Sequence, residues 1–351
     1  MSKFWSPEVH QLTPYVPGEQ PRQRLIKLNT NENPYPPAPG VADTLRDFDA
    51  SALRLYPDPE SRALRTAIAE HYAVTPEQVF VGNGSDEVLA LAFMAFFRQP
   101  LPLYMPEISY SFYPVYCQLY GVERKALPLD HEWKVDLEAF PTDNGGVIFA
   151  NPNAPTGHAH PREAIAGLLE RQRDSVVLVD EAYVDFGAQS AVPLIERYPN
   201  LLVCGTFSKS RSLAGLRLGF AIGSKELIEG LGRVKNSFNS YPIDRLAEAC
   251  AIASLADQAY FERCTAAVIA TREWSREALK ARGFNVLPSS SNFLFARPTR
   301  IDGPALFESL RERGLLVRHF SSPALAPFLR ITIGTDEEMR TLVEAIDEIQ
   351  A

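Results

Sequence analysis

The chain has 351 residues, of which 46% are hydrophobic and 22% charged, and it carries a net charge of −8 at pH 7. This composition is that of a globular protein long enough for two domains, and the acidic balance argues against nucleic acid or an anionic membrane as main partner. No apolar run reaches the roughly 18–20 residues of a membrane span, the start lacks a signal-peptide core, and the cysteines lack the spacing of disulfide frameworks or zinc sites. We therefore expect a cytoplasmic protein.

The first 43 residues are unusually rich in proline between Pro7 and Pro39. Prolines at this density disfavour helix and favour an extended arm that lies on other surfaces. A disordered tail is the alternative. We favour the arm because residues 25–28 resemble a short strand, and because Tyr15 and Tyr35 offer aromatic area to bury.

From about residue 44 the chain alternates between helical patterns and short apolar runs. Residues 61–72 place Leu64, Ile68 and Tyr72 on one helical face, with Ser61 as the N-cap. A second helix is predicted over 161–173. The apolar runs, each leading into small or polar residues, are 79–81, 103–105, 147–149, 176–179 and 201–203. Continuous apolar runs indicate a mostly parallel sheet covered on both faces, and such sheets bind ligands beyond the carboxyl ends of their strands.

Lys209 follows the last of these runs, with Ser208 and Ser210 on either side and Arg217 further along. A lone lysine is normally a solvated surface residue. A lysine beyond a buried strand, among hydroxyls and near an arginine, suits a reactive amine. Such an amine can form a Schiff base with a cofactor aldehyde while its neighbours hold an anionic group.

Two other strand ends carry residues that fit such a cofactor. Residues 82–87 close one strand and open a helix that runs to about Phe97, so free N–H groups there would attract one phosphate; a tight structural turn is the alternative. Asp180 ends another strand, where it caps a turn or keeps a pyridine nitrogen protonated. Tyr183, three residues later, could then reach a phenolic oxygen of the same ligand.

Two further strand ends are open to both structural and functional interpretations. Residues 151–157 form a proline-containing turn. Tyr110 follows a strand and either packs in the core or stacks on a flat ring. His158 and His160 are close together without further nearby ligands, so we expect surface residues rather than metal ligands.

Motifs spread over nearly the whole chain point to one family. They are Leu12–Tyr15, Leu28–Pro34, Leu55–Asp58, Gly82–Glu87, Pro155–Gly157, Asp180–Tyr183, Phe207–Lys209, Ala214–Arg217, Val317–Arg318 and Leu329–Thr335. With these motifs the chain resembles the fold-type I aminotransferases that use pyridoxal 5′-phosphate, and within them the histidinol-phosphate aminotransferases.

The resemblance implies a role for each matching residue in cofactor binding. Lys209 would be the Schiff-base lysine and would move the proton, Asp180 would pair with the pyridinium, and Tyr183 would donate to the ring oxygen. The phosphate would be held by Ser85 and Asp86 through their backbone, and by Ser208 and Arg217 through their side chains. Tyr110 would stack on the ring.

Further implied roles concern the substrate and a second subunit. Tyr56 would reach the phosphate in the neighbouring subunit, which would make the enzyme a homodimer with shared sites. Arg330 would bind the anionic group of the substrate, and Arg318 and Tyr15 would surround its phosphate.

The chain departs from the family at one position. The family usually has asparagine directly before Pro-Thr-Gly, where this chain has Ala154, whose side chain cannot donate a hydrogen bond. Either Asn153 supplies the amide to the cofactor, or Tyr183 carries the role alone.

The resemblance implies an α/β fold with an N-terminal arm (1–43), a large cofactor-binding domain with a mostly parallel sheet flanked by helices (44–240), and a smaller α+β domain (241–351). In the last of these, residues 336–349 read as an amphipathic helix capped by Thr335. The implied function is ping-pong transamination between a small-molecule amino donor, histidinol phosphate, and the oxo acid acceptor 2-oxoglutarate. Transamination of aromatic amino acids and decarboxylation of threonine phosphate remain alternatives.

Overall fold

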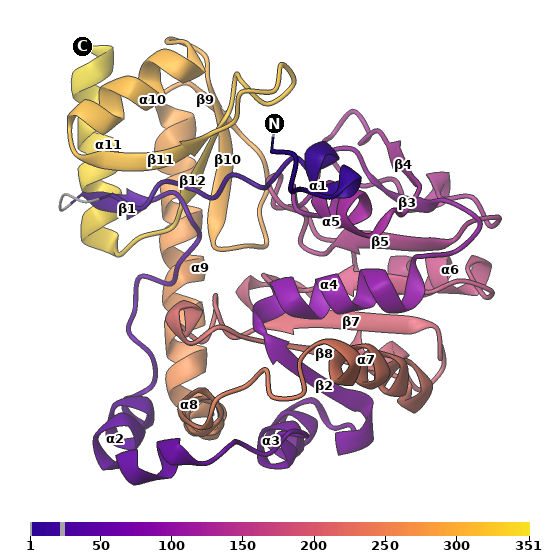
Figure 1. The fold of residues 1–351 in the computed structure, drawn as a ribbon. Coiled ribbons are helices and arrows are strands. Elements are labelled where there is room, and N and C mark those ends of the chain that lie inside the picture. Colours follow the sequence, from indigo (N-terminus) through magenta and orange to yellow (C-terminus); the bar gives the residue numbers. More distant parts are fainter. Residues whose placement is uncertain (1, 22–24) are drawn as a thin grey trace.

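The computed structural model describes residues 2–21 and 25–351, and two β-sheets organise them (Figure 1). The larger sheet has seven strands in the order β2-β8-β7-β6-β5-β3-β4. Its strands are β2 (Val79–Asn83), β3 (Leu103–Pro106), β4 (Arg124–Leu127), β5 (Gly146–Ala150), β6 (Val177–Asp180), β7 (Leu201–Thr206) and β8 (Leu218–Gly223). β8 runs antiparallel to both its neighbours, and the other pairs are parallel, which confirms a mostly parallel sheet.

Both faces of this sheet are buried, because successive side chains of a strand point to opposite faces. Val147 and Phe149 of β5 join one apolar cluster, and Ile148 between them joins the other. The flanking helices are α3 (Arg62–Tyr72), α4 (Gly84–Phe96), α5 (Tyr113–Tyr120), α6 (Arg162–Arg171) and α7 (Lys225–Phe238). The continuous apolar runs in the sequence are therefore strands with two covered faces.

The smaller sheet has the order β1-β11-β12-β10-β9. Its strands are β1 (Ile26–Leu28), β9 (Phe284–Val286), β10 (Phe293–Pro298), β11 (Leu315–His319) and β12 (Leu329–Thr332). The helices of this part are α9 (Gln258–Ala281), α10 (Gly303–Glu312) and α11 (Asp336–Gln350), whereas α8 (Arg245–Ala256) packs with α2 (Pro39–Asp47) and α3 on the core of the larger sheet. Thr335 caps α11 reciprocally with Glu338, and Met339, Leu342 and Ile346 are buried, as predicted for an amphipathic helix.

The N-terminal arm connects the two sheets. It starts beside α5, where the N–H of Thr13 donates to Gln118 Oε1 at 2.9 Å, and then supplies β1, which pairs in parallel with β11 (Figure 1). The expectation that prolines exclude helix from this region was wrong. Pro7 begins α1 (Pro7–Gln11) and Pro39 begins α2 (Pro39–Asp47). The N–H groups of the first helical turn have no acceptor within the helix, so a proline at that position breaks no hydrogen bond.

Two local expectations also need correction. Ser61 precedes α3 as predicted, but its backbone is left-handed (φ 43°) and its side chain makes no capping hydrogen bond. His158 is buried rather than exposed, and His160 is half-buried. The turn after β5 folds back, with Asn153 N–H donating to His158 O at 2.7 Å, and this brings His158 under the loop that contains Lys134.

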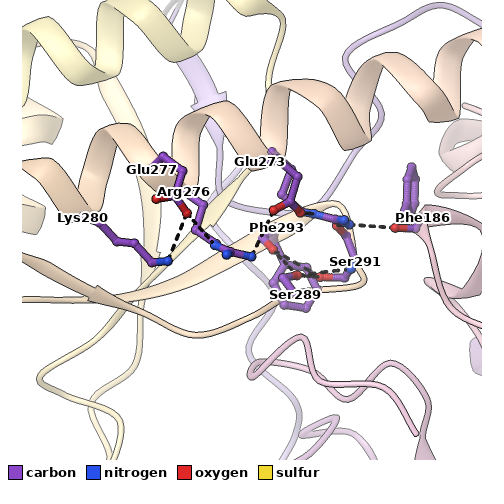
Figure 2. Close-up of polar contacts among 9 residues, drawn as sticks. Phe186, Glu273, Arg276, Glu277, Lys280, Ser289, Ser291 and Phe293 are labelled. Carbon is purple, nitrogen blue, oxygen red and sulfur yellow. Dashed lines mark hydrogen bonds and ion pairs between the residues drawn. The ribbon is translucent and has the colours of Figure 1, made fainter. Parts of the chain in front are cut away.

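Helix α9 runs from the neighbourhood of α8 to the smaller sheet (Figure 1). Its buried Arg272 donates through Nη1 to the carbonyl of Phe186, which follows β6, at 2.7 Å, and to that of Ser291, which precedes β10, at 2.9 Å. Figure 2 shows these contacts, together with the ion pairs that continue along the helix to Lys280. Arg272 therefore ties the segment after β6 to the smaller sheet.

The four cysteines, Cys117, Cys204, Cys250 and Cys264, are all buried and free. Within the described residues, no helix has both the length and the hydrophobicity needed to cross a membrane.

Candidate active site

A cavity of about 370 Å³ lies beyond the carboxyl ends of β5, β6 and β7. Eight sequence-predicted residues line it: Ser85, Asp86, Tyr110, Asp180, Tyr183, Ser208, Lys209 and Arg217. Gln20, Thr30 and Glu32 of the arm complete one wall. The site is thus assembled from strand ends that are far apart in sequence, and the arm closes over them.

Lys209 follows β7 and extends its amine into this cavity. Its Nζ donates to the backbone carbonyl of Thr30 at 3.0 Å. Burial lowers the pKa of this amine to about 8, with a further contribution from the positive charge of Arg330, and Glu32 opposes the shift. A lysine with such a pKa holds a considerable neutral, nucleophilic fraction near physiological pH.

Asp180 ends β6 at the bottom of the cavity and is only 4% exposed. Tyr113 donates from its hydroxyl to Oδ2 at 2.8 Å, and the N–H of Ala182 donates to Oδ1 at 3.1 Å. Burial raises the pKa of this carboxyl to about 6 in spite of both hydrogen bonds. The carboxylate is therefore held rigidly and would be stabilised by a cationic partner in the cavity.

The start of α4 forms the anion-binding end of the cavity. Gly84 has a positive φ of 76°, and a Cβ there would come within 2.5 Å of the Arg217 guanidinium. Arg217 Nη2 contacts Asp86 Oδ2 at 3.1 Å, and Tyr110 donates to Asp86 Oδ1 at 2.9 Å. With Ser208 nearby in the lining, the helix N-terminus, a guanidinium and a hydroxyl form the usual donor set for a phosphate.

Tyr183 also lines the cavity. The amide Nδ2 of Asn31 donates to this oxygen at 2.9 Å. Burial raises the pKa of the phenol, so the hydroxyl keeps its proton. The amine of Lys209 lies 5.8 Å from the centre of the Tyr183 ring.

Asn153, one of the two predicted donors to the cofactor, does not line the cavity. Its Nδ2 donates to the carbonyl of Ile108 at 3.0 Å and to Thr156 Oγ1 at 3.2 Å, and its Oδ1 accepts from Ser109 at 2.8 Å. Both amide protons are therefore used, one on the segment after β3 and the other within the turn. Ala154 takes its place on the cavity wall.

Three other predicted residues flank the lining. Arg318 on β11 and Arg330 on β12 face each other across the ladder, and both guanidinium groups lie over the ring of Phe320, at 5.5 and 5.6 Å from its centre. Arg330 donates to the carbonyl of Asn29 at 2.8 Å, and its buried Nε has no partner among the described residues. The ring of Tyr15 lies 6.5 Å from that of Tyr110.

Tyr56 lies apart from the cavity of its own chain. It belongs to the turn after the short 3₁₀ helix Ala50–Arg54, and it is 77% exposed. Its ring stacks on Tyr241 with 4.7 Å between centres, and Arg245 Nη2 donates to its carbonyl at 2.6 Å. This tyrosine is held in place at the surface, available to another molecule.

Sequence reasoning missed the contribution of residues 29–33. Asn33 Nδ2 donates to the backbone carbonyls of Lys209 and Ser210 at 3.2 and 3.1 Å. Asn31 contacts Tyr183, and Glu32 lines the cavity. The run was part of the resemblance, but an asparagine-rich segment that follows a three-residue strand gives no local indication of its distant partners.

Residues 23–346 match the protein family described as aminotransferase class I and II. The chain belongs to this family. This aminotransferase is 69% identical over 349 residues to the histidinol-phosphate aminotransferase of Chromohalobacter salexigens, with 99% of each chain covered. It is 57% identical to histidinol-phosphate aminotransferase 2 of Thiobacillus denitrificans, over 98% of this chain and 97% of that one.

Solved structures confirm the fold of this aminotransferase. The histidinol-phosphate aminotransferase of Sinorhizobium meliloti in complex with pyridoxal-5′-phosphate matches with a TM-score of 0.89 at 24% identity, over 99% of each chain. The L-threonine-O-3-phosphate decarboxylase of Porphyromonas gingivalis matches with a TM-score of 0.80 at 21% identity, over 93% of this chain and 99% of that one. At such identities the likeness concerns the fold alone, and the fold is common to both activities.

Proposed function

We propose that this aminotransferase transfers the amino group of histidinol phosphate to 2-oxoglutarate, giving imidazole acetol phosphate and glutamate in histidine biosynthesis. The observation that carries this proposal is the 69% identity, over 99% of both chains, to a relative named for that activity. The cavity supports it, because a buried lysine, a buried carboxylate and an anion-binding helix start line the same space.

The donor set of the cavity fits pyridoxal 5′-phosphate. Arg217, Ser208 and the start of α4 would hold its phosphate, Asp180 its ring nitrogen, and Tyr183 its phenolic oxygen. When bound, this cofactor supplies an aldehyde for the amine of Lys209 and a ring that takes up the electron pair of the substrate's Cα–H bond. Burial raises the pKa of Asp180 to about 6, so a protonated ring nitrogen beside it would stabilise the charged form of this carboxylate.

Lys209 is the residue that we propose to move the proton. Its pKa near 8 leaves part of the amine neutral at pH 7, so Nζ can accept the Cα proton of a bound substrate. The carbonyl of Thr30 lies 3.0 Å from Nζ and restricts the directions in which the amine can point. The protonated amine can then return the proton to an adjoining atom.

Arg330, Arg318 and Tyr15 are the proposed substrate-binding residues. The unpartnered buried Nε of Arg330 leaves donor capacity for an anion. A guanidinium can bind either a carboxylate or a phosphate by donating two parallel hydrogen bonds. The same arginines can therefore serve glutamate and histidinol phosphate in alternation, as a ping-pong sequence requires.

We further propose a cytoplasmic homodimer in which Tyr56 serves the cofactor phosphate of the partner subunit, with Tyr110 stacked on the cofactor ring within each subunit. The exposed but stacked position of Tyr56 supports the first of these roles.

The four free buried thiols fit a reducing compartment. We also propose a functional division into an arm (1–43), a large domain (44–240) and a small domain (241–351). The two separate sheets support it, although α8 of the third segment packs on the core of the larger sheet and β1 of the arm completes the smaller one.

Product analysis tests the proposed reaction. Purified protein is mixed with histidinol phosphate and 2-oxoglutarate, and we expect glutamate to form. Glutamate that appears only with an aromatic amino acid as donor, or carbon dioxide released from threonine phosphate, would assign the site to another activity.

Borohydride reduction tests the lysine separately. We expect it to fix pyridoxal 5′-phosphate to the unsubstituted protein and not to the Lys209→Ala variant. Equal trapping in both proteins would refute the assignment of Lys209.

A further inference from the structure

Asn31 links the site to the smaller sheet through four hydrogen bonds. It is 1% exposed and has a left-handed backbone, with φ 57°. Its N–H donates to Thr332 Oγ1 at 3.0 Å, its Oδ1 accepts from the same hydroxyl at 2.9 Å, and its carbonyl accepts from Asn292 at 2.9 Å. The fourth contact is the donation from Nδ2 to the hydroxyl oxygen of Tyr183 at 2.9 Å.

These contacts fix which end of the amide faces Tyr183. The hydroxyl of Thr332 accepts the Asn31 backbone N–H, and its single proton goes to Oδ1. The oxygen of the Asn31 amide is thereby turned toward Thr332. Its NH₂ group is turned toward Tyr183.

The orientation of the amide determines what Tyr183 can do. A phenol has one proton to donate, and here its oxygen already accepts the Asn31 amide. The proton of Tyr183 is therefore directed away from Asn31, and the side chain lines the cavity. Ala154, which also lines the cavity, has no donor in its side chain.

We infer that Asn31 is a positioning residue that directs the Tyr183 hydroxyl, as a hydrogen-bond donor, toward the phenolic oxygen of the cofactor. The inference rests on the proposed use of pyridoxal 5′-phosphate. Asn31 would then contribute to the reaction, in addition to holding residues 29–33 against the smaller sheet. In this chain the task falls on Tyr183 because position 154 cannot share it.

Asn31→Asp is the decisive substitution, because it keeps the shape and tolerates the left-handed backbone. A carboxylate at this position still accepts from Thr332 but also accepts from Tyr183, so it draws the tyrosine proton away from the cofactor. The readout is the pH midpoint of the visible absorption of the cofactor-loaded protein. A hydrogen bond to the phenolic oxygen favours its negatively charged form, so losing the bond raises the midpoint, by about one unit.

The comparison with Tyr183→Phe separates this mechanism from a general charge effect. We expect Asn31→Asp and Tyr183→Phe each to raise the midpoint, and the double variant to raise it no further than Tyr183→Phe alone. Asn31→Gly, which adds no charge and suits a positive φ, should give a smaller shift that also vanishes in the Tyr183→Phe background. An unchanged midpoint in Asn31→Asp, or an equal shift with and without the Tyr183 hydroxyl, would overturn the inference.

Asn144→Asp is the matched control for loss of stability. Asn144 is also buried, and it donates to Gln172 and to the carbonyl of Pro141, both at 2.6 Å, outside the cavity lining. Its substitution should lower the melting temperature and leave the midpoint unchanged. If the unsubstituted protein has no visible band and no borohydride-trapped cofactor, the proposed function itself fails, which is distinguishable from a failure of Asn31 alone.

Discussion

The hydroxyl of Tyr113 donates a hydrogen bond to Oδ2 of Asp180 over 2.8 Å, between two buried side chains on α5 and β6. This bond lowers the pKa of Asp180 against the larger effect of burial, which raises it to about 6. In Tyr113→Phe we expect the pKa of Asp180 to rise further, so the acidic limb of the pH–rate profile should move to higher pH. Stability should fall by about 1–2 kcal/mol. An unchanged acidic limb would show that Tyr113 does not support Asp180.

The buried amine of Lys209 should make cofactor-free protein less stable below pH 8. Its folded-state pKa of about 8 lies below the ordinary 10.5, so between these values the unfolded chain holds more protons and stability rises with pH. Lys209→Met removes this dependence. We expect the stability of the variant relative to the unsubstituted protein to be greatest at pH 7 and to decline by pH 9.5, as measured by urea denaturation. A constant difference would mean that the amine is not destabilised by burial.

Gly84, at the phosphate end of the site, and Gly121, which follows α5 outside the cavity lining, offer a matched pair. Both have positive φ, 76° and 65°, but a Cβ on Gly84 would meet Arg217, whereas nothing lies within 4 Å of one on Gly121. Both alanine variants should lose about 1 kcal/mol of stability through backbone strain. Only Gly84→Ala should also weaken cofactor binding, by about ten-fold or more. Spectroscopic titration with pyridoxal 5′-phosphate measures this, and equal affinities in the two variants would exclude the clash.

Ala154→Asn restores the residue usual in the family on a wall of the cavity. The site is 6% exposed and opens toward the ligand space. An added amide donor should slow the loss of cofactor during dialysis, by up to about ten-fold. If retention is unchanged, Tyr183 alone already satisfies the phenolic oxygen.

Subunit mixing tests whether Tyr56 acts in the partner's site. In a mixed dimer of Tyr56→Ala and Lys209→Ala chains, one site would receive both defects and the other would be intact. A refolded equimolar mixture should therefore recover about a quarter of the unsubstituted activity, because half of the dimers are mixed and each has one intact site. No recovery would place Tyr56 in the site of its own chain, whereas full activity of the Tyr56→Ala protein by itself would place it outside the mechanism.

The strand-end residues were predictable because buried parallel strands have a simple sequence pattern. Lys209, Asp180 and the start of α4 each follow a continuous apolar run, and the topology of such sheets brings those ends together. The resemblance then gave each of them a chemical role. Their location thus needed only local pattern and one general rule about sheets, whereas their roles rested on the resemblance.

Other features depend on contacts that no local pattern contains. The antiparallel strand β8 was not predicted, because it begins directly after Arg217 with no turn signal between them. It passes close to the start of α4 at Gly219, where a Cβ would lie 2.2 Å from the backbone N of Ser85. The inward position of His158 depends on how the preceding turn folds back. Asn153 was a plausible donor by sequence position, but its amide bonds to Ile108 and Thr156 instead.

The bond between Asn31 and Thr332 joins residues 301 positions apart. During synthesis on the ribosome, the segment around Asn31 emerges early and its partner strand β12 emerges almost last. The arrangement that orients Tyr183 therefore cannot form until nearly the whole chain has been synthesised.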